Sequence, residues 1–552
     1  NAAMALVYSG EAATAGVWLK FMLRRNNMDT FTNPVLSGFY PDPSICKKDN
    51  DYYLVTSSME FFPCIPVFHS TDLVHWRQIG HVLEKAERFD LKSCEASGGI
   101  MAPTIRYYKG TFYVTCSCEG KHFICTTEDP ETGWNDPVYI DGAEGIDNSL
   151  FFDDDGRCYY HANCILSGGE RCYGDRVIWL QEFDYCSFRL IGPKKIVFFG
   201  AGGLWCEAPH IYKENGCYYL ICAEGGTMRN HSVICARSDT IWGPYQSSPA
   251  NPLLTSRHLS RSYPIQNIGH LDMVKTQNGE WWAVALGSRP YGGFDDTQRG
   301  DGLGGYFRNL GRETFLLPMT WERDWPVFCP DSGKVELTYS KPRLPDSPVE
   351  LLPATTVFST HGLGPEWNFV RTPIEKWWQT GIQGLTMKLR PQTIAECVNP
   401  SFIGRRQQHF SFTIETLIEF DPRADGEEAG LVLFHNRHAY ITFLIGQKKQ
   451  DCAARIISSY KGKQIEYESF PVRRRPAILR ICTVGQTAAF YICSIDSSEF
   501  TKVVSNVSTA MLNSDATGSH TGTYVGMYAT SNGKISENTA VFRYFSYTGN
   551  NL

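Results

Sequence analysis

The sequence lacks the features of nucleic-acid-binding and membrane-spanning proteins. Its 52 basic and 58 acidic residues are interspersed and give a net charge of -6, and no block of Lys and Arg is long enough to follow a phosphate backbone. No apolar run is long enough to cross a lipid bilayer. We therefore expect neither a nucleic acid nor a membrane among the partners of this chain.

A recognisable secretory signal is also missing from the first 27 residues. Their apolar stretches are interrupted by Glu11, and the basic residues follow the apolar part, whereas a signal peptide has the opposite order. Orderly patterning begins near residue 32. We therefore interpret residues 1–31 as an N-terminal extension, with Met28 as a candidate native start.

The 19 cysteines do not form the even, loop-borne pattern of a disulfide framework. Many lie within apolar, strand-like runs, which predicts mostly reduced, buried thiols and favours an intracellular location. Sequons at Asn230 and Asn506 leave secretion open. Cys116 and Cys118 lie in the run TFYVTCSC, whose alternation with period two predicts a strand rather than a metal site.

What the sequence does contain is typical of an all-β protein. Aromatic residues make up 13% of the chain, and 49 glycines suit short strands and tight turns. At 552 residues the chain exceeds the size at which a single hydrophobic core usually stops growing. Two domains are therefore expected.

One sequence element recurs five times: an apolar strand, a polar turn and a pair of aromatic residues. The second aromatic residues of the five pairs are Tyr53, Tyr113, Tyr160, Tyr219 and Trp282. Turns such as Lys-Gly, Asp-Gly and Asn-Gly between alternating apolar runs predict β-hairpins. Repeats of about 50 to 60 residues are long enough for four-stranded blades. The pattern predicts a five-bladed β-propeller over residues 32–335, and an ordinary β-sandwich with similar hairpins is the alternative.

The composition of the sequence changes near residue 330, where the repeat with paired aromatic residues ends. A segment rich in Pro, Ser and charge predicts a linker at residues 336–354. Short alternating or apolar runs follow, among them FSFTIETLIEF, AYITFLIG and TYVGMYAT, without a clear helical pattern. We expect a β-sandwich over residues 355–552.

Four ionisable residues occupy equivalent places in separate repeats. Asp42, Asp147, Glu207 and His270 each precede the first paired aromatic residue of their repeat by 10 to 12 positions. The innermost strands of a propeller run along its axis, so equivalent strand starts surround one mouth of the central channel. We therefore expect these four side chains to converge.

Paired carboxyl groups at one site suit glycosidic bond hydrolysis, which needs one protonated acid and one ionised carboxylate. Asp42 lies between two prolines that fix the backbone, which suits a positioned base. Glu207 lies among bulky apolar residues that favour its protonated form, which suits the acid, and Asp147 supplies a nearby charge. Taken singly, each residue has a structural alternative, as a turn residue or as the buried partner of an arginine.

The motifs FYPDPS, GIDNSLFFDDDG, WCEAPHIYK, CAEGGT, IGHLDMV and LGRETFL resemble glycoside hydrolase family 43, especially its β-xylosidases and α-L-arabinofuranosidases. The C-terminal part is similar to the concanavalin-like sandwich of many of those enzymes. The resemblance implies that Asp42 is the general base, Glu207 the general acid and Asp147 the residue that modulates the acid's pKa. It also implies that Arg312 and the axial His270 contact the sugar, and that hydrolysis inverts the anomeric configuration.

The resemblance also predicts the pocket walls. Met59 and Met101 stand where related β-xylosidases often carry Phe and Trp, so flexible thioethers replace flat rings, and Phe61 is a candidate to compensate. The segment around His520 is expected to reach the pocket from the sandwich. No catalytic metal or organic cofactor is implied, although a calcium ion near His270 is compatible with the family.

The expected function is an exo-acting, inverting glycosidase that releases terminal pentoses from xylo-oligosaccharides or arabinoxylan fragments. A β-D-xylosidase with additional α-L-arabinofuranosidase activity is favoured. The first alternative is an α-L-arabinofuranosidase acting on arabinoxylan side chains. The alternative from another class is a non-catalytic glycan-binding protein. An oligomeric state is compatible with each of these functions.

Overall fold

The computed structural model describes residues 29–291, 307–358, 360, 362–448, 451–472 and 476–550. Nearly all of the predicted N-terminal extension, including Met28, therefore lies outside the described residues. Within the described ranges, no helix combines the length and apolar character needed to cross a membrane. The two short helices there are η1 (Ala86–Arg88) and α2 (Ser514–Thr517).

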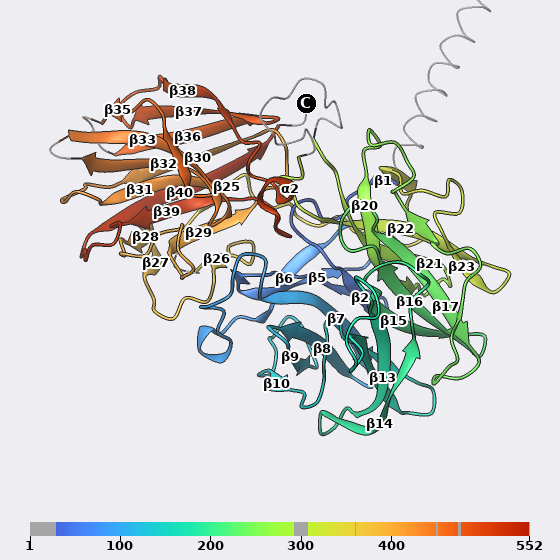
Figure 1. Cartoon of the computed structure of the whole chain (residues 1–552). Coiled ribbons are helices and arrows are strands. Elements are labelled where there is room, and N and C mark those ends of the chain that lie inside the picture. Colours follow the sequence, from blue (N-terminus) through green and yellow to red (C-terminus); the bar gives the residue numbers. More distant parts are fainter. Residues whose placement is uncertain are drawn as a thin grey trace, which may run out of the picture.

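The first part of the chain forms five antiparallel sheets, which are the blades of a propeller (Figure 1). The prediction of a five-bladed propeller is confirmed, and the alternative sandwich for this region is wrong. The first blade contains β2 (Ser44–Lys48), β3 (Asp51–Val55), β5 (Cys64–Ser70) and β6 (Arg77–Leu83), and the second contains β7 (Ile100–Tyr108), β8 (Thr111–Cys118), β9 (Lys121–Thr127) and β10 (Val138–Tyr139). The third contains β11 (Ser149–Phe152), β12 (Cys158–Cys164), β13 (Val177–Asp184) and β14 (Arg189–Phe198), and the fourth contains β15 (Glu207–Glu214), β16 (Cys217–Glu224), β17 (Ser232–Ser238), β18 (Gln246–Ser247) and β19 (Leu254–Thr255). The fifth contains β20 (Gln266–Lys275), β21 (Trp281–Ser288), β22 (Glu313–Glu322) and β23 (Trp325–Phe328).

The hairpin turns follow from residues that adopt positive φ. Lys109 and Gly110 have φ values of 47° and 89°, and Asn215 and Gly216 have values of 51° and 78°. Two successive residues with positive φ form the tight turn that matches the twist of paired strands. These turns join β7 to β8 and β15 to β16.

A left-handed residue also stands within two positions of the start of the innermost strands β2, β7, β11 and β15, and near the middle of β20. We call the five residues the collar: Asp42, Ala102, Asp147, Ala208 and His270, with φ values of 55°, 46°, 55°, 51° and 50°. None is glycine, so each conformation costs about 1–3 kcal/mol and persists only where the surrounding structure enforces it. The collar bends the chain sharply at one end of the propeller axis.

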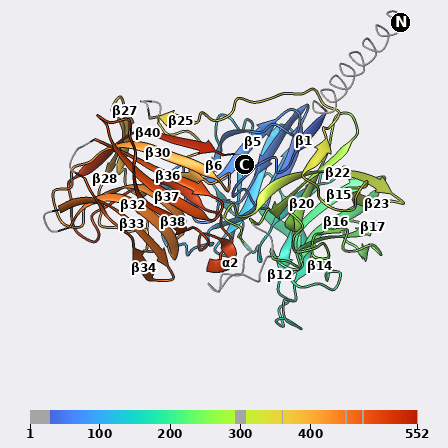
Figure 2. The same cartoon turned by 90° about the horizontal axis from the view of Figure 1, so that it is seen from above.

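The remaining chain forms a sandwich of two antiparallel sheets (Figure 2). One sheet contains β25 (Thr355–Val357), β27 (Trp378–Gly381), β28 (Gly384–Lys388), β30 (Phe412–Glu419), β36 (Ala477–Val484), β37 (Thr487–Ser494), β38 (Thr501–Ser508) and β40 (Thr539–Gly549). The other contains β29 (Ser401–Arg406), β31 (Glu428–Asn436), β32 (Ala439–Lys448), β33 (Asp451–Tyr460), β34 (Lys463–Glu466), β35 (Phe470–Pro471) and β39 (Tyr524–Thr530). Buried and partly exposed residues alternate along β30, as expected for a strand that covers a core with one face. The predicted C-terminal sandwich is confirmed.

The two domains share a strand pair and a hydrophobic core. β4 (Phe61–Phe62) of the propeller pairs with β26 (Phe369–Val370) of the sandwich, and one cluster of buried residues extends through both domains. Within the predicted linker, β24 (Thr338–Ser340) pairs with β1 (Thr30–Thr32). The sandwich is therefore packed against the propeller rather than tethered to it.

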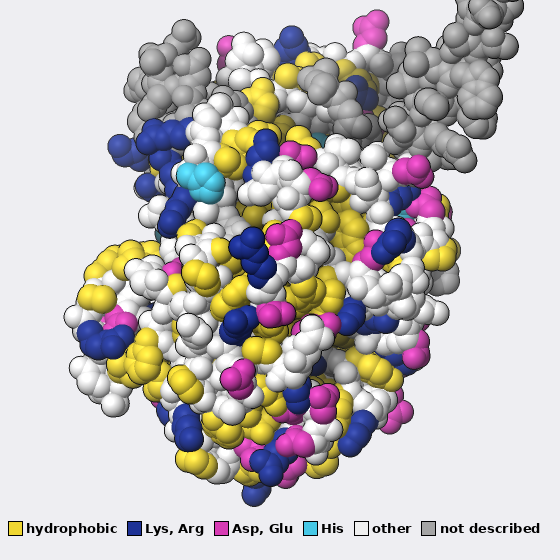
Figure 3. Space-filling model, turned by 90° about the vertical axis from the view of Figure 1, so that its right-hand side faces the viewer, with side chains coloured by type: hydrophobic (Ala, Val, Ile, Leu, Met, Phe, Trp, Pro, Cys, Tyr) yellow, Lys and Arg dark blue, Asp and Glu magenta, His cyan; other side chains and the backbone are white. Residues whose placement is uncertain are grey.

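The distribution of surface charges and the state of the cysteines match the expectations from the sequence. On the face of the propeller in Figure 3, basic and acidic side chains are interspersed. All 19 cysteines are free and most are buried. Cys116 is buried within β8, as the alternating pattern of that strand predicts.

Candidate active site

A pocket of about 460 Å³ opens at the end of the propeller axis that carries the collar. Four collar residues line it, and the fifth, Ala208, directly follows the lining residue Glu207. The expected convergence of the inner strand starts at one mouth is thus observed. The lining residues are Asp42, Met59, Met101, Ala102, Ile146, Asp147, Arg176, Trp205, Glu207, Ala223, Gly226, Thr227, Met228, His231, His270, Leu286, Arg312 and His520.

Asp42 is buried and held by three neighbours. Its Oδ1 accepts a hydrogen bond from Arg312 Nη1 at 2.6 Å, and its Oδ2 accepts one from Ser57 Oγ at 2.6 Å. His270 Nδ1 lies 3.8 Å from Asp42 Oδ1. Burial raises the pKa of Asp42, but the Arg312 guanidinium and the nearby His270 outweigh burial and hold this pKa below its ordinary value. The carboxylate is therefore ionised and fixed in orientation.

Glu207 has the opposite electrostatic environment. Burial raises the pKa of Glu207 to about 7, the Asp42 carboxylate adds to this rise, and Arg176 opposes it. Below about pH 7 most copies of this carboxyl group therefore retain a proton that can be donated. Two carboxyl groups with pKa values shifted in opposite directions therefore line one pocket.

Asp147 is a third buried carboxyl group of the pocket, and both Glu207 and Asp42 influence its pKa. Its Oδ2 accepts a hydrogen bond from the backbone N–H of Ala208, at 3.1 Å. Burial raises the pKa of Asp147 well above its ordinary value, and the Glu207 and Asp42 carboxylates raise it further. The negative charges of ionised Asp147 and Glu207 repel each other, so the two carboxyl groups titrate as a pair, and the first proton leaves more readily than the second.

Of the five predicted sugar contacts, four line the pocket: Arg312, His270, Met59 and Met101. Phe61 does not. It is fully buried and stacks on Tyr524 of the sandwich, with 3.8 Å between ring centroids and 15° between ring planes. Phe61 therefore belongs to the domain interface and does not compensate for Met59 and Met101.

Several lining residues were not predicted from the sequence. Arg176 is the last residue of the β12–β13 connection and forms an ion pair with Glu170. Trp205 stands two positions before Glu207, and Tyr173 packs edge-on against its ring at 5.5 Å. Both lie in connections outside the hairpin repeat. The position of Trp205 beside Glu207 was the one available signal, whereas Arg176 lies in no repeated motif.

The sandwich contributes His520 to the pocket, as the sequence predicts. The His520 carbonyl accepts a hydrogen bond from Arg312 Nη2 at 3.3 Å, and its N–H donates to Ser97 Oγ at 2.8 Å. This loop therefore bonds directly to the arginine that holds Asp42. The second domain helps to close the mouth of the pocket.

The residues of the pocket do not form a recognisable metal site. In the described ranges, the one group of three ligand-type side chains close enough to share an ion is Asp72, His75 and Asp346, and none of them lines the pocket. There Asp72 and His75 already bond to each other at 2.7 Å. A calcium ion near His270 stays a prediction.

Comparison with known proteins agrees with this geometry. The model for glycosyl hydrolases family 43 matches residues 31–326, and that for the β-xylosidase C-terminal concanavalin A-like domain matches residues 355–548. The chain is 37% identical to a xylosidase/arabinosidase of Butyrivibrio fibrisolvens, over 93% of this chain and 98% of the relative. It is 36% identical to a non-reducing end α-L-arabinofuranosidase of Bacteroides ovatus, over 94% of each chain.

A solved structure gives the same result in three dimensions. A xylan β-1,4-xylosidase of Bacillus halodurans superimposes with a TM-score of 0.86, at 31% identity, over 94% of this chain and 99% of that chain. Both domains and their order are therefore shared with the relatives. Since the family model covers more than half of the sequence, this chain belongs to glycoside hydrolase family 43.

Proposed function

We propose that this protein is an exo-acting, inverting glycosidase that removes terminal pentose units from xylan-derived oligosaccharides. The observation that carries the proposal is the pair of carboxyl groups in one pocket, Asp42 with a lowered pKa and Glu207 with a raised pKa. Groups whose environments separate their pKa values in this way are suited to divide the roles of base and acid.

In the proposed mechanism Asp42 accepts a proton from a water molecule as its oxygen attacks the anomeric carbon. Glu207 donates its proton to the glycosidic oxygen, and the bond between this oxygen and the anomeric carbon breaks. A single displacement inverts the anomeric configuration, for which the two carboxyl groups should lie about 6.5–9.5 Å apart. Arg312 keeps Asp42 oriented, and the chemistry uses no metal or organic cofactor.

The architecture supports exo action. The pocket lies at one end of the propeller axis, and His520 from the sandwich lines it together with the propeller residues. A pocket that accepts one chain end favours release of terminal units over cleavage within a chain. The relatives named for xylosidase and arabinofuranosidase activities support pentoses as the units released.

β-D-Xylosidase is the first choice of activity, and α-L-arabinofuranosidase is the second candidate. The second is favoured by the similarity to the Bacteroides ovatus arabinofuranosidase and by the thioethers of Met59 and Met101, which form a less rigid wall than aromatic rings. A non-catalytic glycan-binding protein would not need carboxyl groups with opposed pKa shifts.

The test compares kcat/KM for aryl β-D-xylopyranoside and aryl α-L-arabinofuranoside. We expect the xyloside to be the better substrate and the released xylose to appear first as the α-anomer, as observed by NMR. A preference for the arabinoside would establish the second candidate. Failure to hydrolyse either substrate would favour the binding protein.

The pH dependence of kcat/KM should be bell-shaped. Glu207 must be protonated, so activity is expected to fall about tenfold per pH unit above its pKa of about 7. Asp42 must be ionised, and its pKa lies below the ordinary value of 3.8, so the acid limb should appear only below about pH 4. Steady-state rates on an unactivated disaccharide check both limbs. A basic limb above about pH 9 would exclude Glu207 as the acid.

A further inference from the structure

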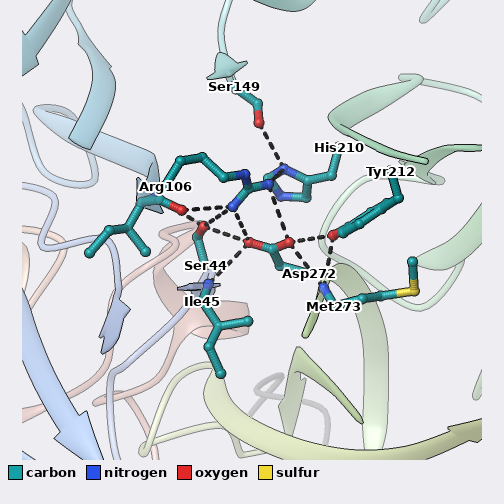
Figure 4. A network of polar contacts seen from close by, with 9 residues as sticks. Ser44, Ile45, Arg106, Ser149, His210, Tyr212, Asp272 and Met273 are labelled. Atoms are coloured by element: carbon teal, nitrogen blue, oxygen red, sulfur yellow. Dashed lines mark hydrogen bonds and ion pairs between the residues drawn. The ribbon is translucent and has the colours of Figure 1, made fainter. Parts of the chain in front are cut away.

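A fully buried carboxylate, Asp272 on β20, lies at the centre of a polar network on the propeller axis (Figure 4). Six donors saturate its two oxygens, and they come from the inner strands of four blades. For Oδ2 they are Ser44 Oγ at 2.6 Å, Ile45 N at 3.0 Å and Arg106 Nη1 at 2.8 Å; for Oδ1 they are Arg106 Nη2 at 3.3 Å, the Tyr212 hydroxyl and Met273 N at 3.0 Å.

His210 extends the network to the remaining blade. Arg106 Nη2 donates to His210 Nδ1 at 2.9 Å, and Ser149 Oγ lies 3.0 Å from the same nitrogen. Burial lowers the pKa of His210 to about 3, so the ring is neutral and Nδ1 is free to accept. Since Ser149 lies on β11, all five innermost strands contribute to the network.

In each of the five blades, one network residue lies two or four positions after the collar residue. The pairs are Asp42 and Ser44, Ala102 and Arg106, Asp147 and Ser149, Ala208 and His210, and His270 and Asp272. Because the two residues of each pair are so close in the chain, a displacement of the network residue also displaces the collar residue. The collar in turn carries Asp42 and Asp147 and adjoins Glu207.

We propose that Arg106, His210 and Asp272 are positioning residues that hold the collar in its left-handed conformation and so fix the spacing of the carboxyl groups. The inference rests on the proposed function for the roles of Asp42 and Glu207. A non-glycine residue in the left-handed region reverts to a relaxed conformation unless neighbouring groups prevent it. The hydrogen bonds of the network supply this constraint, because they fix the backbone two or four residues after each collar residue.

Two sets of variants separate positioning from simple stabilisation. Arg106→Lys keeps the positive charge, but an ammonium group cannot bond simultaneously to both Asp272 oxygens and to His210. His210→Leu removes the Nδ1 acceptor, whereas His210→Asn places a carbonyl oxygen near its position. As a matched control, Glu428→Gln disrupts the Arg455–Glu428 ion pair of the sandwich, which is similarly buried.

The variants are compared by kcat, KM and hydrogen exchange, at a temperature at which circular dichroism shows all of them to be folded. Arg106→Lys and His210→Leu should lower kcat about 100-fold with KM changed only a few-fold, the loss expected when reacting groups move by about 1 Å. His210→Asn should restore most of kcat, and Glu428→Gln should match the wild type.

Hydrogen exchange gives a readout that does not depend on activity. In His210→Leu, peptides covering residues 40–46 and 145–151 should exchange faster, although the substitution lies in another blade. Exchange confined to residues 205–212, an unchanged kcat in both disruptive variants, or equal losses in His210→Asn and His210→Leu would overturn the proposal. If the wild type proves inactive, the proposed function fails, and the exchange measurement still decides whether the network holds the collar.

Discussion

Asp42→Asn is expected to lower kcat about 10²- to 10⁴-fold, the contribution of general base catalysis. The amide cannot accept a proton from the attacking water. Its Oδ1 can still accept the hydrogen bond from Arg312, so the shape of the pocket should persist. Steady-state kinetics on the better aryl glycoside gives kcat, and calorimetric titration with the free pentose gives the affinity, which should stay within a few-fold of the wild type.

The matched control for this substitution is Asp51→Asn, on the same blade. Asp51 is partly exposed, bonds to His69 and does not line the pocket. It should retain wild-type kcat, which would assign the effect at Asp42 to its position rather than to a lost negative charge. If Asp42→Asn kept more than a tenth of wild-type kcat, Asp42 could not be the base.

Glu207→Gln should separate substrates by the quality of their leaving groups. On a disaccharide, whose sugar alkoxide leaves poorly without a proton, kcat/KM is expected to fall about 10²- to 10⁴-fold. On a dinitrophenyl glycoside, whose leaving group departs without protonation, the loss should be less than about tenfold. The comparison uses both substrates with the wild type and the variant under identical conditions.

The same variant also tests the origin of the basic limb. With Gln at position 207, the residual kcat/KM on the disaccharide should no longer decline above pH 7, because no titrating acid remains at that position. Equal losses on both substrates, or an unchanged basic limb, would move the acid role to Asp147, the other carboxyl group with a raised pKa.

The repeat in the sequence was sufficient to predict the propeller and the convergence of its ionisable residues. Asp42, Asp147 and His270 stand at equivalent points because hairpin turns and paired aromatic residues recur with every blade. The left-handed conformation at these points was not predictable. Aspartate, alanine and histidine share no turn signal that distinguishes the collar from an ordinary strand start.

Pocket residues outside the repeat could not be predicted from the sequence for a different reason. Arg176 and Trp205 come from connections whose conformation depends on tertiary packing rather than on local periodicity. The prediction for Phe61 was wrong because alternation along a strand identifies a buried face without revealing what covers it. In this protein the ring of Tyr524, more than 460 residues later, covers that face.

The pairing of β4 with β26 has a consequence for synthesis of the chain. Phe61 and Phe62 leave the ribosome about 300 residues before their partners Phe369 and Val370. At about 5–20 residues per second, that interval lasts roughly 15–60 s. During this time β4 lacks its partner strand, and Phe61 lacks the Tyr524 ring that stacks on it in the folded protein. A chaperone that binds the growing chain would protect this stretch, and expression conditions that slow translation would prolong its exposure.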